Sequence, residues 1–355
     1  MKILTVVGTR PELIRLSLII KKLDSLVDHI LVYTNQNYDY NLSGIFFNEL
    51  KIREPNYFFN KESKSFSQFA SNTFELFNSI LESEKPDKIL VLGDTNSGLL
   101  SIVAKKANIP VVHMEAGNRS YDDRLPEETN RRIIDSVSKY NLPYTENSKQ
   151  NLLNEGFHKN FVFKTGNPIF EVLLHYNDEI EGSNILTSLN VERQRYVLVT
   201  AHRSENVDNV VSLTGICSAI NKIAEQFKVI FPVHPRTKEK LGKFNITLSD
   251  NVVVADPMGF FDFVKLEKNA LVVISDSGTV QEETCIYGVP SLTIRETTER
   301  QETIECGSNI LVGTDTDDIL GAYNTVIDRD YAWMPPDDYL VRNVSDVVIN
   351  ILLGK

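Results

Sequence analysis

Short apolar runs alternate with longer stretches of helical periodicity along the whole chain. This alternation predicts parallel sheets covered by helices, because a crossover helix returns each strand alongside the one before it. In the first half, the predicted strands are Lys2–Val7, His29–Thr34, Lys88–Leu92, Ile109–Met114 and Phe161–Lys164. The predicted helices between them are Pro11–Leu23, Phe66–Glu84, Gly98–Lys106, Glu127–Val137 and Ser148–Asn154.

The second half repeats the same pattern. Its predicted strands are Tyr196–Thr200, Lys228–Val233, Val252–Ala255, Leu271–Ser275 and Pro290–Ile294, and its predicted helices are Val210–Phe227, Phe260–Lys268 and Gln281–Tyr287. A chain of 355 residues also exceeds the ~250–300 residues at which a single core stops growing. We therefore expect two doubly wound α/β domains, residues 1–167 and 168–340, with a final helix in 341–355 that packs back on the first domain.

The composition is that of a soluble globular protein, with 42% hydrophobic and 24% charged residues. No apolar run approaches the ~18 residues of a membrane-spanning helix, and the first strand turns into Gly8–Glu12 without a cleavage site. Three cysteines (Cys217, Cys285 and Cys306) lack metal-ligand spacing and suit buried reduced thiols in the cytoplasm. The net charge of −11 argues against a nucleic-acid partner.

Arginines gather near the predicted strand ends although the protein is acidic. They are Arg10, Arg15, Arg119, Arg124, Arg131, Arg203, Arg236, Arg295 and Arg300. Ligands of open parallel sheets bind beyond the carboxyl ends of the strands. An anionic small molecule in a cleft between two such sheets is therefore the expected ligand. A solvated surface position better explains any single arginine but explains the whole set less well.

Three carboxylates at strand ends and helix starts are candidates for acid–base chemistry: Asp94, Glu115 and Glu127. A carboxylate that is partly desolvated, or close to another, has its pKa raised toward working pH. For the pair Glu127 and Glu128 the alternative is simple helix-start pairing with Arg131 and Arg132, one turn later.

Two histidines, His202 and His234, each follow a predicted strand. Neither has the neighbours that a metal site needs, so catalysis, phosphate contact or a purely structural role remains for His202. His29, His158 and His175 lie at element edges without charged company, and we expect them to be structural.

A turn of small residues, Ser277-Gly278-Thr279, leads from a strand into a helix. Free backbone N–H groups at the positive end of a helix dipole form a phosphate seat. The alternative is an ordinary helix cap by Ser277 or Thr279. Glu283, one turn further, could accept hydrogen bonds from ribose hydroxyls, and the glycine motifs of dinucleotide and P-loop sites are absent.

Eight strings, in order, resemble the motifs of the non-hydrolysing UDP-N-acetylglucosamine 2-epimerase family. They are VVGTRPE (6–12), GDTNS (93–97), HMEAGNR (113–119), PEETNRR (126–132), TAHRSEN (200–206), PVHP (232–235), SDSGTVQEE (275–283) and RETTERQE (295–302). The resemblance runs from residue 1 to about Gly313. It implies a glycosyltransferase-B-like architecture, two Rossmann-like domains around a central cleft, and a homodimer.

The resemblance also implies a reaction without a nicotinamide or metal cofactor. A carboxylate removes the proton at carbon 2 of a UDP-sugar while UDP leaves carbon 1, and protonation from the other face with return of UDP completes the inversion. The family's acid–base positions fall on Asp94, Glu115 and Glu127, and its catalytic histidine falls on His202. The positions assigned to UDP-sugar binding are Arg10, Arg15 (where the family usually has lysine), Arg131, His234, Ser277, Gly278, Thr279, Glu283 and Arg300.

One segment departs from the family pattern. Many members have a Gln-His-Arg-like string after the second strand, linked to a regulatory second substrate molecule, whereas this chain has TNQNYDY at residues 34–40. The sequence looks more like the branch that converts UDP-2-acetamido-2,6-dideoxy-L-talose to UDP-N-acetyl-L-fucosamine for capsule or O-antigen synthesis. A UDP-N-acetylglucosamine 2-epimerase, a hydrolysing relative, a glycosyltransferase of the same fold and a nucleotide-sugar sensor remain the alternatives.

Overall fold

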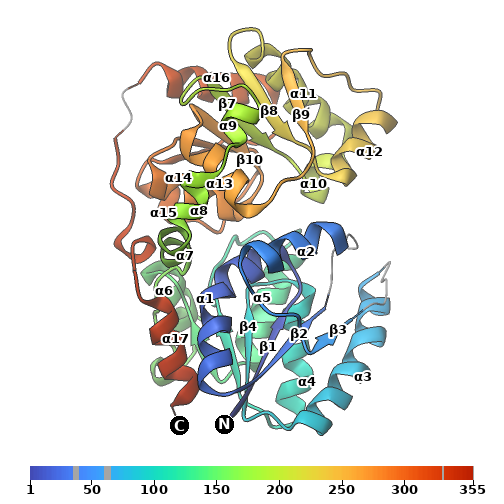
Figure 1. The fold of residues 1–355 in the computed structure, drawn as a ribbon, viewed down its shortest axis with the longest axis vertical. Coiled ribbons are helices and arrows are strands. Elements are labelled where there is room, and N and C mark those ends of the chain that lie inside the picture. Colours follow the sequence, from blue (N-terminus) through green and yellow to red (C-terminus); the bar gives the residue numbers. More distant parts are fainter. Residues whose placement is uncertain (35–39, 60–64, 330–331, 355) are drawn as a thin grey trace. The chain divides into compact units, whose positions relative to one another are not determined.

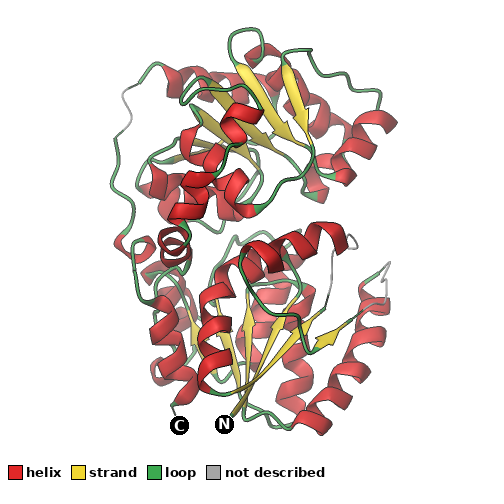
Figure 2. Cartoon of the chain, in the orientation of Figure 1, coloured by secondary structure: helices red, strands yellow, loops and turns green. Residues whose placement is uncertain are grey.

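The chain folds into two compact units in a computed structural model that describes residues 1–34, 40–59, 65–329 and 332–354. Unit 1 comprises Met1–Leu173 and Asp338–Lys355, and unit 2 comprises Leu174–Asp337. Within the described residues, each unit contains a six-stranded parallel sheet against which helices pack (Figures 1 and 2). The α/β class with two Rossmann-like units is thereby confirmed.

The sheet of unit 1 has the order β3-β2-β1-β4-β5-β6. Its strands are β1 (Lys2–Val7), β2 (Asp28–Tyr33), β3 (Tyr57–Phe58), β4 (Lys88–Leu92), β5 (Val111–Met114) and β6 (Tyr140–Leu142). The central strand β1 pairs with β2 on one side and β4 on the other. The strand order therefore reverses beside β1, and the turns after β1 and β4 meet at the edge where ligands of such sheets bind.

The helices of unit 1 cover this sheet and bury its apolar side chains. They are α1 (Arg10–Leu26), α2 (Tyr40–Glu49), α3 (Phe66–Glu84), α4 (Ser101–Lys106), α5 (Pro126–Val137), α6 (Glu146–Asn154), α7 (Ile169–His175, which crosses the unit boundary) and α17 (Val344–Leu353). Pro11 lies in the first turn of α1, where its missing N–H costs nothing.

The last helix, α17, packs against α1 within unit 1 (Figure 1). Lys22 on α1 donates to Ser345 Oγ at 2.8 Å. At the other end of α17, the Lys88 ammonium donates to the Leu352 carbonyl at 2.8 Å and to the Ile351 carbonyl at 3.3 Å. A cation at the carboxyl end of a helix satisfies its terminal carbonyls and complements the helix dipole.

The sheet of unit 2 has the equivalent order β12-β11-β10-β7-β8-β9. Its strands are β7 (Tyr196–Thr200), β8 (Lys228–Pro232), β9 (Val252–Ala255), β10 (Val272–Ser275), β11 (Ser291–Thr293) and β12 (Asn309–Leu311). Its helices are α8 (Asn177–Gly182), α9 (Ile185–Ser188), α10 (Ser204–Val207), α11 (Val210–Ile223), α12 (Pro235–Lys243), α13 (Phe260–Asn269), α14 (Gly278–Tyr287), α15 (Gln301–Glu305) and α16 (Thr316–Ile327). Separate apolar clusters fill the two faces of the sheet, one under α11 and α16 and one under α13.

The predicted strand Phe161–Lys164 is wrong. Residues Lys159–Phe161 form a short 3-10 helix, and Val162 makes only an isolated bridge to Asn141. The sixth strand is instead β6, whose three residues include the polar Asn141 and do not form an apolar run. The helix predicted to begin at Gly98 starts as a 3-10 helix, Asn96–Leu100, and continues as the α-helix α4 from Ser101.

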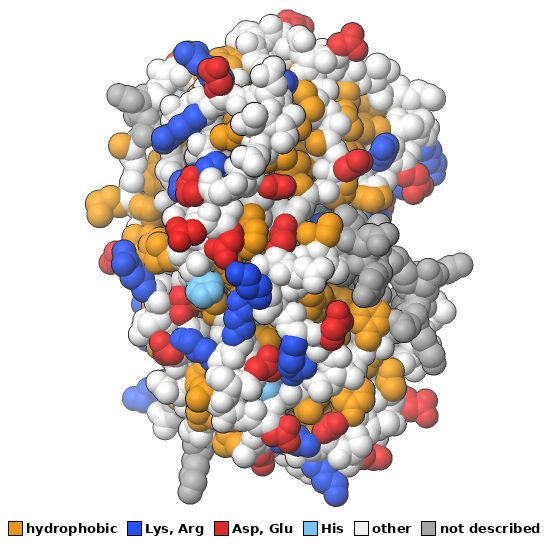
Figure 3. Space-filling model, viewed as in Figure 1, with side chains coloured by type: hydrophobic (Ala, Val, Ile, Leu, Met, Phe, Trp, Pro, Cys, Tyr) orange, Lys and Arg blue, Asp and Glu red, His pale blue; other side chains and the backbone are white. Residues whose placement is uncertain are grey.

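Charged side chains of both signs are scattered over the face drawn in Figure 3. Among the helices that the structure describes, none is both long and apolar enough to cross a membrane. Cys217 and Cys285 are buried as expected, whereas Cys306 is only half-buried, and all three are free thiols.

Candidate active site

Glu12 ties together the turns that follow β1 and β4. Its carboxylate accepts hydrogen bonds from Gly8 N at 2.5 Å and from Thr95 Oγ1 at 2.7 Å. The side chain is buried, and burial raises the pKa of Glu12 from 4.5 to about 7, although these donors act in the opposite direction. The turn that carries Arg10 is thereby fixed beside the turn that carries Asp94.

Asp94 is paired with Arg131, a buried arginine of α5. Arg131 also contacts Glu128 Oε2 at 3.2 Å, and Glu128 in turn pairs with Arg132 at 3.0 Å. The helix-start pairing considered above therefore describes Glu128, which is buried. Glu127 lies half-buried in the first turn of α5, and its predicted role as acid or base stays a prediction.

Glu115 forms a buried ion pair with Arg15 of α1. The Arg15 guanidinium lies 5.8 Å from the centre of the Tyr144 ring. Glu115 itself has a φ of 64°, a left-handed conformation that costs a non-glycine residue about 1–2 kcal/mol. Strain of this kind persists only where the surroundings enforce it, and it concentrates at functional sites.

Arg10 lies at the start of α1 with its guanidinium 5.6 Å from the centre of the Phe46 ring. Burial lowers the pKa of Arg10. Unit 1 therefore brings Arg10, Arg15 and Arg131 to the edge of its sheet that also carries Asp94 and Glu115. Carboxylates held by arginines can act as proton acceptors, and the arginines can stabilise developing negative charge.

In unit 2, His202 is oriented by Asp276. Its ring Nδ1 lies 3.1 Å from Asp276 Oδ1, while Asp276 Oδ2 accepts from the backbone N–H groups of His202 and Arg203, both at 2.8 Å. Burial favours the neutral acid, but the His202 ring and these donors outweigh it and lower the pKa of Asp276 to about 2. The imidazole remains 43% exposed, so an oriented histidine faces a region that a ligand can enter.

His234 lies near His202, with ring centres 6.3 Å apart. It is the N-cap of α12, where its Nδ1 accepts from Arg236 N at 3.3 Å. From the sequence, we expected only that His202 and His234 each follow a different strand. The closeness of their two rings was not predicted.

The turn Ser277-Gly278-Thr279 opens α14 as expected. The Ser277 and Thr279 hydroxyls lie 3.1 Å from each other, and within the described structure the N-cap residue Ser277 makes no side-chain cap hydrogen bond. The simple-cap alternative is therefore not realised at Ser277. Glu283 is buried one turn further along α14.

Buried arginines surround this turn and are joined by Glu299. Glu299 contacts Arg295 at 3.0 Å and Arg300 at 3.4 Å, and Arg300 Nε contacts Glu282 at 2.6 Å. A Cβ atom added at Gly278 would lie 2.9 Å from a Glu299 oxygen. A side chain at position 278 would therefore require the Glu299 carboxylate to move away from the start of α14.

A second buried carboxyl lies beside Glu283. Glu267 on α13 is fully buried, and burial raises its pKa well above 4.5, with a further contribution from the charge of Glu283. Burial and the neighbouring charge therefore both favour the protonated form of Glu267, next to the residue that we predicted to contact ribose.

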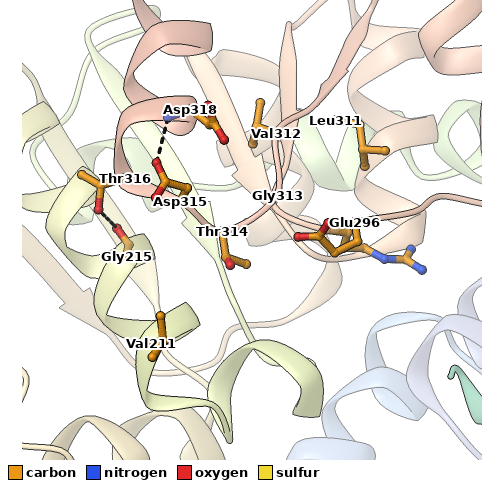
Figure 4. Close-up of a pocket in the computed structure, with 11 residues that line it drawn as sticks. Val211, Gly215, Glu296, Leu311, Val312, Gly313, Thr314, Asp315, Thr316 and Asp318 are labelled. Atoms are coloured by element: carbon orange, nitrogen blue, oxygen red, sulfur yellow. Dashed lines mark hydrogen bonds between the residues drawn. The ribbon is translucent and has the colours of Figure 1, made fainter.

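A pocket of about 600 Å³ opens in unit 2 at the carboxyl ends of β11 and β12 (Figure 4). Glu296, Thr314 and Asp315 line it together with Arg295, and a hydrogen bond of 3.0 Å from Thr316 to the Gly215 carbonyl closes one side. It touches the arginine cluster through Arg295, but none of the predicted nucleotide contacts lines it.

Sequence reasoning missed Glu12, Asp276 and Glu299 as organising residues, whereas the helix-start alternative already included Glu128. Glu12 contacts Thr95 and Asp276 contacts His202 and Arg203, residues distant in sequence, so no local pattern marks either carboxylate. The contacts of Glu299 with Arg295 and Arg300 are local and could have been inferred from their spacing. Among the described residues, no group of three or more His, Cys, Asp or Glu side chains could hold a metal ion. Asn35–Asp39, on which the argument about regulation rests, lies outside the described residues.

Comparison with known proteins adds the identity of the fold and family. The family model described as UDP-N-acetylglucosamine 2-epimerase matches residues 21–353. The chain is 40% identical to a UDP-N-acetylglucosamine 2-epimerase of Methanocaldococcus jannaschii over 347 residues, 95% of each chain. It is 35% identical to a UDP-2,3-diacetamido-2,3-dideoxy-D-glucuronate 2-epimerase of Pseudomonas aeruginosa over 335 residues, 93% of each chain.

Among solved structures, the Methanocaldococcus jannaschii enzyme in complex with UDP-GlcNAc and UDP has a TM-score of 0.94 and 38% identity, with 99% of each chain covered. The two units thus have the glycosyltransferase-B-like architecture of nucleotide-sugar 2-epimerases, which are isomerases. This chain belongs to the UDP-N-acetylglucosamine 2-epimerase family.

Proposed function

We propose that the chain inverts carbon 2 of a UDP-N-acetylhexosamine, with UDP-N-acetylglucosamine and UDP-N-acetylmannosamine as the leading pair. The observation that carries this proposal is the pairing of two strand-end carboxylates, Asp94 and Glu115, with buried arginines in unit 1. The relatives named above support the substrate class, since one is named for UDP-N-acetylglucosamine and is 40% identical.

In the proposed reaction, one carboxylate takes the proton from carbon 2 while the bond from carbon 1 to the UDP oxygen breaks. The products of this step are a 2-acetamidoglycal and UDP, and the electron pair of the broken C–H bond forms the new double bond. A second carboxyl then delivers a proton to the other face of carbon 2 as UDP returns to carbon 1. Asp94, Glu115 and Glu127 are the proposed acid–base residues, and arginines stabilise the leaving diphosphate.

The unit 2 cluster is proposed to hold the nucleotide. Phosphate oxygens would accept from the start of α14 at Ser277, Gly278 and Thr279, and Glu283 would accept from ribose hydroxyls. His202, oriented by Asp276, would contact the diphosphate or move a proton there, with His234 and Arg300 as further contacts.

A second candidate substrate is UDP-2-acetamido-2,6-dideoxy-L-talose, which would give UDP-N-acetyl-L-fucosamine by the same chemistry. The departure of residues 34–40 from the Gln-His-Arg-like string favours it. The name of the Pseudomonas aeruginosa relative shows only that a family member 35% identical to this chain can act on a different sugar. A cytoplasmic homodimer that serves capsule or O-antigen synthesis is the setting expected for either substrate.

The decisive experiment is incubation with each UDP-sugar in heavy water. Epimerisation places deuterium at carbon 2 of the recovered UDP-sugar, whereas a glycosyltransferase leaves carbon 2 unlabelled and a hydrolysing enzyme releases free sugar. Asp94→Asn and Glu115→Gln should abolish exchange but retain UDP binding. Asp87→Asn is the matched control, because Asp87 is an exposed carboxylate before the amino end of β4, the strand that Asp94 follows; it should retain exchange.

A further inference from the structure

His113 is a fully buried residue of β5 whose ring joins two turns of unit 1. Its Nε2 lies 2.9 Å from the Gly93 carbonyl oxygen, and its Nδ1 lies 2.8 Å from Asp135 Oδ1. Asp135 is also fully buried, and its Oδ2 accepts from Arg119 Nη2 at 2.8 Å and from Gly117 N at 3.3 Å. The ring therefore connects the turn after β4 with the turn after β5.

Each of these turns carries one of the proposed acid–base carboxylates. Gly93 directly precedes Asp94 and has a φ of 73°, while Gly117 follows Glu115 by two residues and has a φ of 78°. Glu115 has the left-handed conformation described above. A strained turn keeps one geometry only where hydrogen bonds enforce it, and His113 and Asp135 supply one such bond to each turn.

Both ring nitrogens of His113 face oxygen atoms, the Gly93 carbonyl and the Asp135 carboxylate, so the ring is held at two points. A buried carboxylate needs hydrogen-bonding partners. Asp135 has both His113 and Arg119, and Arg119 Nε in turn lies 2.8 Å from Glu155 Oε1.

We propose that His113 and Asp135 form a positioning pair that fixes the directions of Asp94 and Glu115 for proton transfer at carbon 2. The pair does not touch the reacting atoms. It acts by holding the Gly93 carbonyl and the Gly117 N–H, so its loss loosens both carboxylates at once. This inference rests on the proposed function.

The same sheet contains a natural control for an ordinary buried histidine. His29 is buried, with Nδ1 at 2.6 Å from Asp24 Oδ1 and Nε2 at 2.9 Å from Thr5 Oγ1. The expectation that His29 has no charged neighbour is wrong, because Asp24 reaches it from α1. His29 lies near the amino end of β2, away from the carboxylates, so its pair serves the fold alone.

The test compares His113→Asn with His29→Asn in the full chain. Measured quantities are deuterium incorporation at carbon 2 under saturating UDP-sugar, UDP affinity by calorimetry, and amide hydrogen exchange of peptides covering residues 93–97 and 115–119. Because small misplacement of reacting groups costs on the order of 100-fold in rate, His113→Asn should slow exchange at carbon 2 by about 100-fold. It should keep UDP affinity and speed amide exchange in both peptides, while His29→Asn changes none of these.

The inference is overturned if His113→Asn exchanges carbon 2 as fast as His29→Asn, or if amide exchange of the two turns is unchanged. Asp135→Asn serves as the second variant if His113→Asn does not fold, with the same expected results. If the wild type incorporates no deuterium, the proposed function fails, and the amide-exchange comparison alone then decides whether the pair holds the two turns.

Discussion

The buried carboxyl of Glu12 should make the stability of unit 1 fall as pH rises. Burial raises the pKa of Glu12 from 4.5 to about 7 in the folded protein, while the unfolded chain keeps the ordinary value. The folded state therefore holds the proton more tightly. Its contribution to stability is fully present below about pH 4.5 and is lost as pH rises to about 7.

The size of the effect follows from the two pKa values. Their separation of about 2.5 pH units, at 1.36 kcal/mol per unit, corresponds to about 3 kcal/mol. The perturbation is Glu12→Gln, which keeps the shape of the side chain and an acceptor for Gly8 N but does not titrate. Subtracting the unfolding free energy of the wild type from that of the variant at each pH cancels the other titrating groups.

The assay is urea unfolding between about pH 5 and pH 8, with unit 1 followed by hydrogen exchange of β1 and β4 amides corrected for intrinsic rates. The single tryptophan, Trp333, lies in unit 2, and its fluorescence supplies the control. We expect the variant to gain about 2.5 kcal/mol on the wild type across this range in unit 1, because part of the effect lies below pH 5, with no change in unit 2. A difference that stays constant with pH, or that shrinks as pH rises, refutes the reasoning.

Three further predictions concern single substitutions. Asp276→Asn should destabilise unit 2 at pH 7 by about 2 kcal/mol, because the wild-type carboxylate contributes stability above its ordinary pKa of 3.8 that is lost only as pH falls toward about 2; Trp333 fluorescence in urea measures it. Glu267→Met should stabilise unit 2 increasingly as pH rises above 4.5, because burial raises the pKa of the wild-type carboxyl and its contribution to stability is lost as pH rises; equal stability curves would contradict this. Gly117→Ala should cost unit 1 at least about 1 kcal/mol in urea unfolding, since φ is 78° and a Cβ would lie 2.2 Å from a backbone oxygen of α6; an unchanged midpoint would contradict it.

Much of the fold follows from local pattern alone. The strands β1, β4 and β7 have the predicted bounds, because a buried strand in a parallel sheet is a nearly uninterrupted apolar run with turn residues at its ends. The edge strand β9 and the helix α3 also have the predicted bounds. The short edge strands β3, β6 and β12 have two or three residues each and carry little hydrophobic signal. Phe161–Lys164 misled the prediction because aromatic and β-branched residues also occur in exposed loops, and Phe161 and Phe163 are both exposed.

The sequence suggested candidate members of the site but not their pairings. Strand-end position and family motifs single out Asp94, Glu115 and His202, since the carboxyl ends of parallel strands share one edge. Which arginine pairs with which carboxylate depends on how α1 and α5 pack on the sheet, and that is a tertiary property. The left-handed φ of Glu115 could not be inferred either, because glutamate has no preference for it.

The placement of α17 has a consequence for synthesis on the ribosome. This helix follows all of unit 2 in the chain, yet it belongs to unit 1. Lys22 and Lys88 of unit 1 form hydrogen bonds near its two ends. Unit 2 is one continuous segment and can fold as soon as it leaves the ribosome. Unit 1 cannot complete its fold until unit 2 has been translated, and until then the surface of α1 that α17 covers stays exposed. Nascent chains arrested before α17 should therefore expose the first unit to proteases and chaperones while the second is already protected.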